Sequence, residues 1–88
     1  MREKVLVIKN KLGLHARPAA QFVQAAGKFK SHITIFKDDQ EVDGKSIMGL
    51  MTLAACFGSN LKIVAEGEDE ESAIETLSML IASGFGEE

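Results

Sequence analysis

The stretch LGLHARPAAQFVQAAG, residues 12–27, carries the clearest structural pattern in the chain. Its apolar side chains recur at the spacing of one helix face. They are Ala19, Phe22, Val23 and Ala26. Pro18 falls in the first turn of that helix, where its missing N–H would have had no partner. The stretch therefore predicts a helix over residues 16–26 that follows a loop containing Gly13 and begins directly after His15.

Strand and helix patterns alternate along the rest of the chain. Strands are expected at residues 4–9, 33–36, 41–43 and 61–65, and further helices at residues 47–55 and 69–83. The apolar run of residues 5–8 suggests a central place in the sheet for the first strand, and Asp69 is expected to cap the last helix. The order β-α-β-β-α-β-α fits an antiparallel or mixed sheet with all helices on one face. By spacing alone, its first six elements fit a ferredoxin-like split βαβ fold equally well.

The composition is that of one globular domain, residues 1–88, with 45% hydrophobic and 26% charged residues. The single cysteine, Cys56, excludes an internal disulfide and favours a reducing, cytoplasmic location. We expect no signal peptide and no membrane span, because the apolar runs are far shorter than the about 20 residues that a span needs. A net charge of −3 and a pI near 5.3 speak against nucleic acid as the main partner.

His15 is the first residue with a pattern that points to chemistry. It stands at the predicted helix start, where the backbone N–H groups of Ala16 and Arg17 and the positive end of the helix dipole favour an anion. Arg17 adds a permanently charged donor. The dipole and Arg17 favour a neutral imidazole, the form that can attack a phosphorus centre. The alternative is a surface N-cap beside a solvated charge, but histidine is a poor N-cap.

A second motif, KSIMGLMTLAA at residues 45–55, predicts a short helix that Ser46 caps. So short a helix buries one narrow stripe, for which Leu50 and Leu53 are the expected pair. At least two of three further apolar residues should then be exposed, where adaptable methionines suit several partners. These three are Ile47, Met48 and Met51. Packing of the three residues into the core is the alternative.

The remaining reactive side chains predict no further site. His32 opens a strand and has no cysteine or carboxylate at ligand spacing, so a surface or structural place is expected. Cys56 is expected to be at least partly buried near the end of the helix over residues 47–55. We expect no metal site, no cofactor and no catalytic triad.

Together, LGLHARPAAQF at residues 12–22 and KSIMGLMTLAA at residues 45–55 resemble the histidine-containing phosphocarrier proteins (HPr) of the bacterial phosphoenolpyruvate-dependent phosphotransferase system. The resemblance extends over essentially the whole chain. It implies an α+β fold, the HPr-like open-faced β-sandwich, with a four-stranded antiparallel sheet and three helices on one face. It also implies a monomeric, stoichiometric phosphocarrier without a cofactor, rather than a turnover enzyme.

Individual residues match the family motifs. His15 matches the histidine that accepts a phosphoryl group on Nδ1 from enzyme I and passes it to an EIIA domain. Arg17 matches the arginine that supports the phosphohistidine, and Pro18 the proline that shapes the helix start. Ser46 matches the regulatory serine that HPr kinase/phosphorylase modifies in hosts that possess this enzyme. The apolar docking patch is matched by Ile47, Met48 and Met51. Phe57 is larger and more apolar than the family resemblance leads us to expect there, and we expect it to enlarge this patch.

Two features leave the branch of the family open. The segment NKLG at residues 10–13 is similar to the nitrogen-type paralogue (NPr), with Leu12 where many sugar-type members have a polar residue, and the ending SGFGEE at residues 83–88 points the same way. The segment KSIMG at residues 45–49 is similar to sugar-type, kinase-recognised members. The alternative function is a regulatory HPr-like binding module that acts through protein contacts according to its phosphorylation state. Such modules typically lack the histidine, so His15 argues against this alternative.

Overall fold

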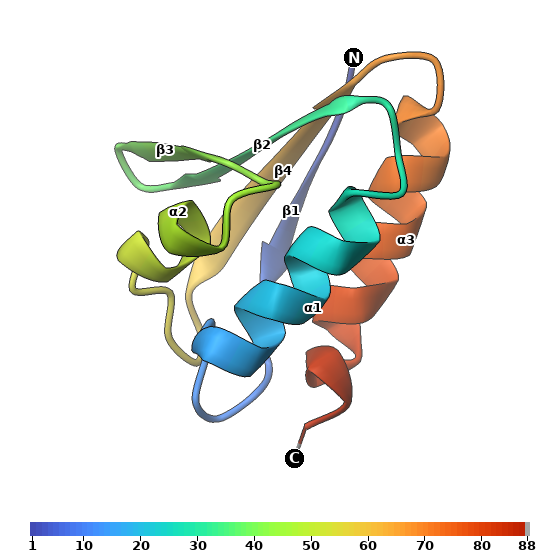
Figure 1. Cartoon of the computed structure of the whole chain (residues 1–88). Coiled ribbons are helices and arrows are strands. Elements are labelled where there is room, and N and C mark those ends of the chain that lie inside the picture. Colours follow the sequence, from blue (N-terminus) through green and yellow to red (C-terminus); the bar gives the residue numbers. More distant parts are fainter. Residues whose placement is uncertain (88) are drawn as a thin grey trace.

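The computed structural model describes residues 1–87, and within them the predicted order of strands and helices is confirmed (Figure 1). The elements are β1 (Arg2–Val7), α1 (Ala16–Ala26), β2 (His32–Lys37), β3 (Gln40–Asp43), α2 (Ile47–Thr52), β4 (Asn60–Glu66), α3 (Glu70–Ala82) and a 3-10 turn, η1 (Gly84–Gly86).

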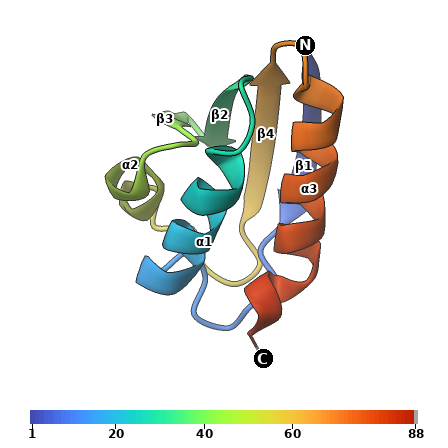
Figure 2. The same ribbon diagram turned by 45° about the vertical axis from the view of Figure 1, so that its right-hand side comes forward.

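The four strands form one antiparallel sheet in the order β1-β4-β2-β3. Alternate residues of β4 point toward the helices, so that Leu61, Ile63 and Ala65 are buried while their neighbours face the other side. Ile33 and Ile35 of β2 extend this apolar layer. Helices α1 and α3 lie side by side over the layer, and α2 packs against α1 and β3 (Figure 2). The expected four-stranded antiparallel sheet with three helices on one face is confirmed.

The central place predicted for the first strand is wrong, because β1 lies at an edge of the sheet. The strand also starts earlier and ends earlier than expected. Val5 is 60% exposed because it pairs with Lys62 and shares the face that no helix covers. The fully buried residue of the apolar run is Ile8, which follows the end of the strand. An unbroken apolar run therefore does not show whether a strand is central or lies at the edge of the sheet with its valines exposed.

The helices follow the apolar stripes that predicted them. Helix α1 has the predicted bounds and buries Pro18 and Phe22. Helix α2 buries Leu50, and Leu53 directly after it is buried too, as predicted. Helix α2 stops at Thr52 rather than near residue 55, because Ala54 takes a left-handed conformation (φ 51°) that does not continue a helix.

The predicted capping of α3 by Asp69 is wrong in its detail. Asp69 occupies the N-cap position, but its side chain makes no hydrogen bond to the first turn of α3. Its carboxylate accepts hydrogen bonds from Lys30 and Ser31 instead. The acidic first turn of the helix, Glu70 and Glu71, is present as predicted and favours the helix dipole.

Candidate functional site

The loop before α1 is held rigidly against the segment that follows α2. The N–H of Leu14 donates to the carbonyl oxygen of Ala55 at 2.8 Å, and the Leu14 side chain is buried. Gly13 has φ +68°, and a Cβ atom at this residue would lie 2.3 Å from that same carbonyl oxygen. Only glycine fits such a close backbone approach in this conformation. The loop therefore fixes the direction from which the chain enters α1.

His15 occupies the N-cap position of α1, as predicted, with an extended backbone (φ −81°, ψ −171°). Its side chain makes no capping hydrogen bond and is 35% exposed. The N–H groups of Ala16 and Arg17 open the helix and have no carbonyl partner within it. Pro18 is the third helical residue and is buried, so the helix start is well anchored. The ring thus stands at the positive end of α1 with part of its surface open.

Glu87 contacts His15, and Asn10 contacts Glu87; the sequence analysis assigned neither residue to the site. Nε2 of His15 lies 3.1 Å from each carboxylate oxygen of Glu87. The fully buried Asn10 donates from Nδ2 to the carbonyl oxygen of Gly13 at 2.7 Å and to Oε1 of Glu87 at 2.9 Å. No local sequence signal connects residues 72 positions apart, and only the acidic character of the chain end was visible.

The contacts of Glu87 favour the ionised form of its carboxyl group. The pKa of the Glu87 carboxyl lies below its ordinary value, and the hydrogen bond with His15 is the largest cause. Partial burial opposes this lowering, while the hydrogen bond from Asn10 and the charge of Arg17 add to it. The Arg17 side chain itself is exposed. An ionised carboxylate can only accept hydrogen bonds, so it faces a proton on Nε2.

The predicted exposure of the apolar residues Ile47, Met48 and Met51 of α2 is confirmed. Met48 is 76% exposed, and the other members of the patch are exposed as well. They are Ile47, Met51 and Phe57. Ser46 caps α2 as predicted, with its Oγ accepting a hydrogen bond from the Gly49 N–H at 3.0 Å. Helix α2, which carries Ile47, Met48 and Met51, packs against α1, the helix that His15 precedes (Figure 2).

Comparison with known proteins identifies the family. A family model described as the PTS HPr component phosphorylation site matches residues 2–83. The chain belongs to the HPr family. Phosphocarrier protein HPr of Neisseria meningitidis serogroup B is 47% identical over 87 residues, 99% of this chain and 98% of that protein. The HPr-like protein Crh of Halalkalibacterium halodurans is 52% identical over 81 residues, 92% of this chain and 96% of that protein.

Solved structures of HPr share the fold. A crystal structure of HPr-C-His from Thermoanaerobacter tengcongensis matches with a TM-score of 0.96 and 57% identity, over 100% of this chain and 99% of that one. A structure of an HPr dimer from the same organism matches with a TM-score of 0.79 and 56% identity, over 99% of this chain and all of that one. As an HPr-family protein, the chain is a phosphocarrier of the phosphotransferase system rather than a turnover enzyme.

The other reactive side chains lie away from any cluster. His32 is exposed at the start of β2. Cys56 is exposed and lies beyond α2, so the expectation of a partly buried residue near the helix end is wrong; the early end of α2 is the reason. Within residues 1–87, no three histidine, cysteine or acidic side chains are grouped to hold a metal ion. In the same part of the chain, no helix is long and apolar enough to span a membrane.

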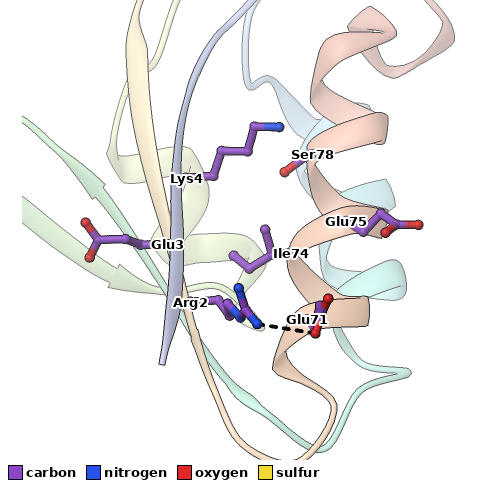
Figure 3. Close-up of a pocket in the computed structure, with 7 residues that line it drawn as sticks. All are labelled: Arg2, Glu3, Lys4, Glu71, Ile74, Glu75 and Ser78. Carbon is purple, nitrogen blue, oxygen red and sulfur yellow. Dashed lines mark hydrogen bonds and ion pairs between the residues drawn. The ribbon is translucent and has the colours of Figure 1, made fainter.

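A pocket of about 280 Å³ lies between β1 and α3, and none of the residues that line it belongs to the His15 site (Figure 3). Its walls carry both signs of charge, including Lys4, Glu75 and the exposed ion pair between Arg2 and Glu71 at 3.4 Å. With two basic and three acidic side chains in its lining, this pocket is not the concentrated positive site that favours an anion.

Proposed function

We propose that this HPr-family protein accepts a phosphoryl group from phospho-enzyme I on Nδ1 of His15 and passes it to EIIA domains in the cytoplasm. The observation that carries the proposal is the position of His15, partly exposed at the N-terminus of α1 beside Arg17. A histidine that a partner protein can reach, at the positive end of a helix, suits the transfer of an anionic phosphoryl group.

In the proposed transfer, the lone pair of Nδ1 forms a bond to phosphorus. The bond between phosphorus and the donor nitrogen of phospho-enzyme I breaks, and its electron pair returns to that nitrogen. The N–H groups of Ala16 and Arg17, together with the Arg17 guanidinium, hold the phosphoryl oxygens. A carrier must not bind this group too tightly, because a stabilised intermediate slows the onward transfer. An open site meets that need.

Docking and regulation use the neighbouring surface. The exposed apolar patch of Ile47, Met48, Met51 and Phe57 supplies the contact area for enzyme I and EIIA. Ser46 borders this patch and is the residue that HPr kinase/phosphorylase would modify in a host that has the enzyme. A phosphoryl group there adds about −1.5 to −2 charges beside the apolar contacts. The protein acts as a monomer in this relay.

The test is the intact mass of the protein after incubation with enzyme I and phosphoenolpyruvate. The parent is expected to gain one phosphoryl group that is lost in acid and retained in base. His15→Ala is expected to gain none, and the matched control His32→Ala is expected to behave like the parent. An unmodified parent in the presence of active enzyme I, or a modified His15→Ala, overturns the proposal.

The second candidate is a regulatory HPr-like module that acts through protein contacts according to the state of Ser46. The observation in its favour is the 52% identity to an HPr-like protein named Crh. This candidate predicts a folded parent that enzyme I does not modify. The same mass measurement therefore separates the two functions.

A further inference from the structure

We propose that Glu87 is a positioning residue for the phosphoryl transfer: it holds the proton of the His15 ring on Nε2 and so leaves the lone pair on Nδ1. This inference deepens the proposed function and rests on it. It does not depend on which partner follows enzyme I.

The geometry of the pair supports this role. Both carboxylate oxygens of Glu87 lie 3.1 Å from Nε2 of His15, within hydrogen-bond distance. An ionised carboxylate has no proton to donate, so the contact requires a proton on Nε2. In a neutral imidazole only one ring nitrogen carries a proton, and the other then presents its lone pair. Glu87 therefore selects the tautomer that has a nucleophilic Nδ1.

Glu87 is itself held in place from two directions. The fully buried Asn10 donates one amide hydrogen to Glu87 and the other to the carbonyl oxygen of Gly13, which ties the chain end to the loop before α1. The chain returns toward this loop through three consecutive left-handed residues. These are Gly84, Phe85 and Gly86, with φ angles of 66°, 58° and 73°.

Burial of the aromatic ring anchors this turn. Phe85 is 4% exposed in the core, and the Glu87 N–H donates to the Gly84 carbonyl oxygen at 3.0 Å. A non-glycine residue in the left-handed region is uncommon and persists where its surroundings stabilise it. The segment of residues 84–87 thus returns to His15, and both views show it at the same end of the molecule as the loop before α1 (Figures 1 and 2).

The same contact continues through the transfer. When Nδ1 takes the phosphoryl group, the ring keeps its Nε2 proton and gains positive charge, and no proton has to move. The hydrogen bond to Glu87 then becomes charge-assisted on both sides and strengthens. Glu87 therefore stabilises the product of the first transfer without touching the phosphoryl group.

The test measures the ring tautomer and the transfer rate in Glu87→Gln. A glutamine amide offers both a donor and an acceptor, so it no longer selects one tautomer. Nitrogen-15 NMR of the His15 ring, at a pH where the ring is neutral, is expected to show the Nε2–H form in the parent and a mixture in the variant. Phosphorylation of His15 by enzyme I is expected to be about tenfold slower in the variant, as for the loss of one charge-assisted hydrogen bond.

Two further variants make the measurement specific. Glu68→Gln removes an exposed carboxylate near the start of α3 and is expected to change neither tautomer nor rate. Glu87→Asp keeps an acceptor-only carboxylate and is expected to retain part of the Nε2–H preference. Equal tautomer populations in the parent and Glu87→Gln overturn the inference. The NMR measurement needs no enzyme I, so an altered tautomer with an unphosphorylated parent rejects the proposed function instead.

Discussion

The carboxylate of Asp69, at the start of α3, is hydrogen-bonded to the backbone N–H and the hydroxyl group of Ser31, in the loop before β2. Asp69 also accepts a hydrogen bond from the Lys30 N–H at 2.8 Å. Gly67 lies against the same serine, because a Cβ atom at Gly67 would come within 2.7 Å of the Ser31 Cα. These contacts fasten the turn between β4 and α3 to the turn between α1 and β2. The end of the molecule opposite the start of α1 is thus fixed by polar groups as well as by core packing (Figure 1).

Ser31→Ala is expected to destabilise the protein by about 1 kcal/mol, because the buried hydroxyl loses its hydrogen bond to Asp69. The free energy of unfolding in urea measures this. Ser72 offers a matched control, since it is an exposed serine on α3 and Ser72→Ala should have little effect. An unfolding free energy for Ser31→Ala equal to that of Ser72→Ala would contradict the structural role assigned to the Ser31 hydroxyl.

Acid is expected to weaken the same contact. The Ser31 hydroxyl, first, and then the Lys30 N–H hold the pKa of Asp69 below its ordinary value of 3.8. Asp69 therefore contributes its stabilisation fully above that ordinary pKa and loses it as the pH falls through the lowered value. Urea unfolding of the parent and Asp69→Asn between about pH 2 and pH 7 tests this. The parent is expected to be more stable near pH 7, and the difference should shrink toward pH 2; a difference independent of pH would contradict the assignment.

The sequence predicted those features that depend on neighbours along the chain. The bounds of α1 followed from its apolar stripe and Pro18, and the exposure of Met48 followed from the narrow stripe that so short a helix as α2 can bury. The cap at Ser46 needed only the residue type and its place. In each case the physical cause lies within one or two helical turns.

Contacts between distant residues were not predictable in this way. Asp69 has the residue type of an N-cap, but a partner 38 positions away competes successfully for its carboxylate. Glu87 is 72 positions from His15, and neither the hydrophobic periodicity nor the spacing of the motifs predicts that they contact each other. The edge position of β1 likewise depends on which strands pair: β4, the last strand along the chain, lies beside it as an inner strand. The resemblance to HPr supplied the topology that periodicity left open.

Gly13→Ala is expected to destabilise the protein by more than about 3 kcal/mol, because it combines a left-handed backbone with a clash against backbone atoms. Gly58 is the matched control. It also has a positive φ, of +87°, but a Cβ atom there meets nothing within 4 Å. Gly58→Ala should therefore cost only the conformational strain, about 1 kcal/mol. Urea unfolding measures the free energy of unfolding of both variants. An equal loss of stability in the two would show that Gly13 is not in close contact with Ala55.

Met48→Ser is expected to weaken binding of enzyme I about three- to tenfold, since an exposed apolar side chain in the docking patch is lost. Stability should hardly change, because Met48 is 76% exposed. Met79→Ser is the matched control, since Met79 is 67% exposed but lies on α3. Calorimetric titration with enzyme I measures the affinity, and thermal unfolding checks the fold. Equal affinities for the two variants would place the docking surface elsewhere.

Ser46 allows stability and docking to be separated at one residue. Ser46→Ala removes the hydroxyl that accepts the Gly49 N–H, so the unfolding free energy is expected to fall by about 1 kcal/mol while phosphorylation of His15 by enzyme I continues. Ser46→Asp keeps a capping acceptor and is expected to retain the fold and the stability. Its charge lies beside Ile47 and Met48, where desolvation on docking is unfavourable, so phosphorylation by enzyme I should be slower. A Ser46→Asp protein that is phosphorylated as fast as the parent would remove the basis for regulation at this residue.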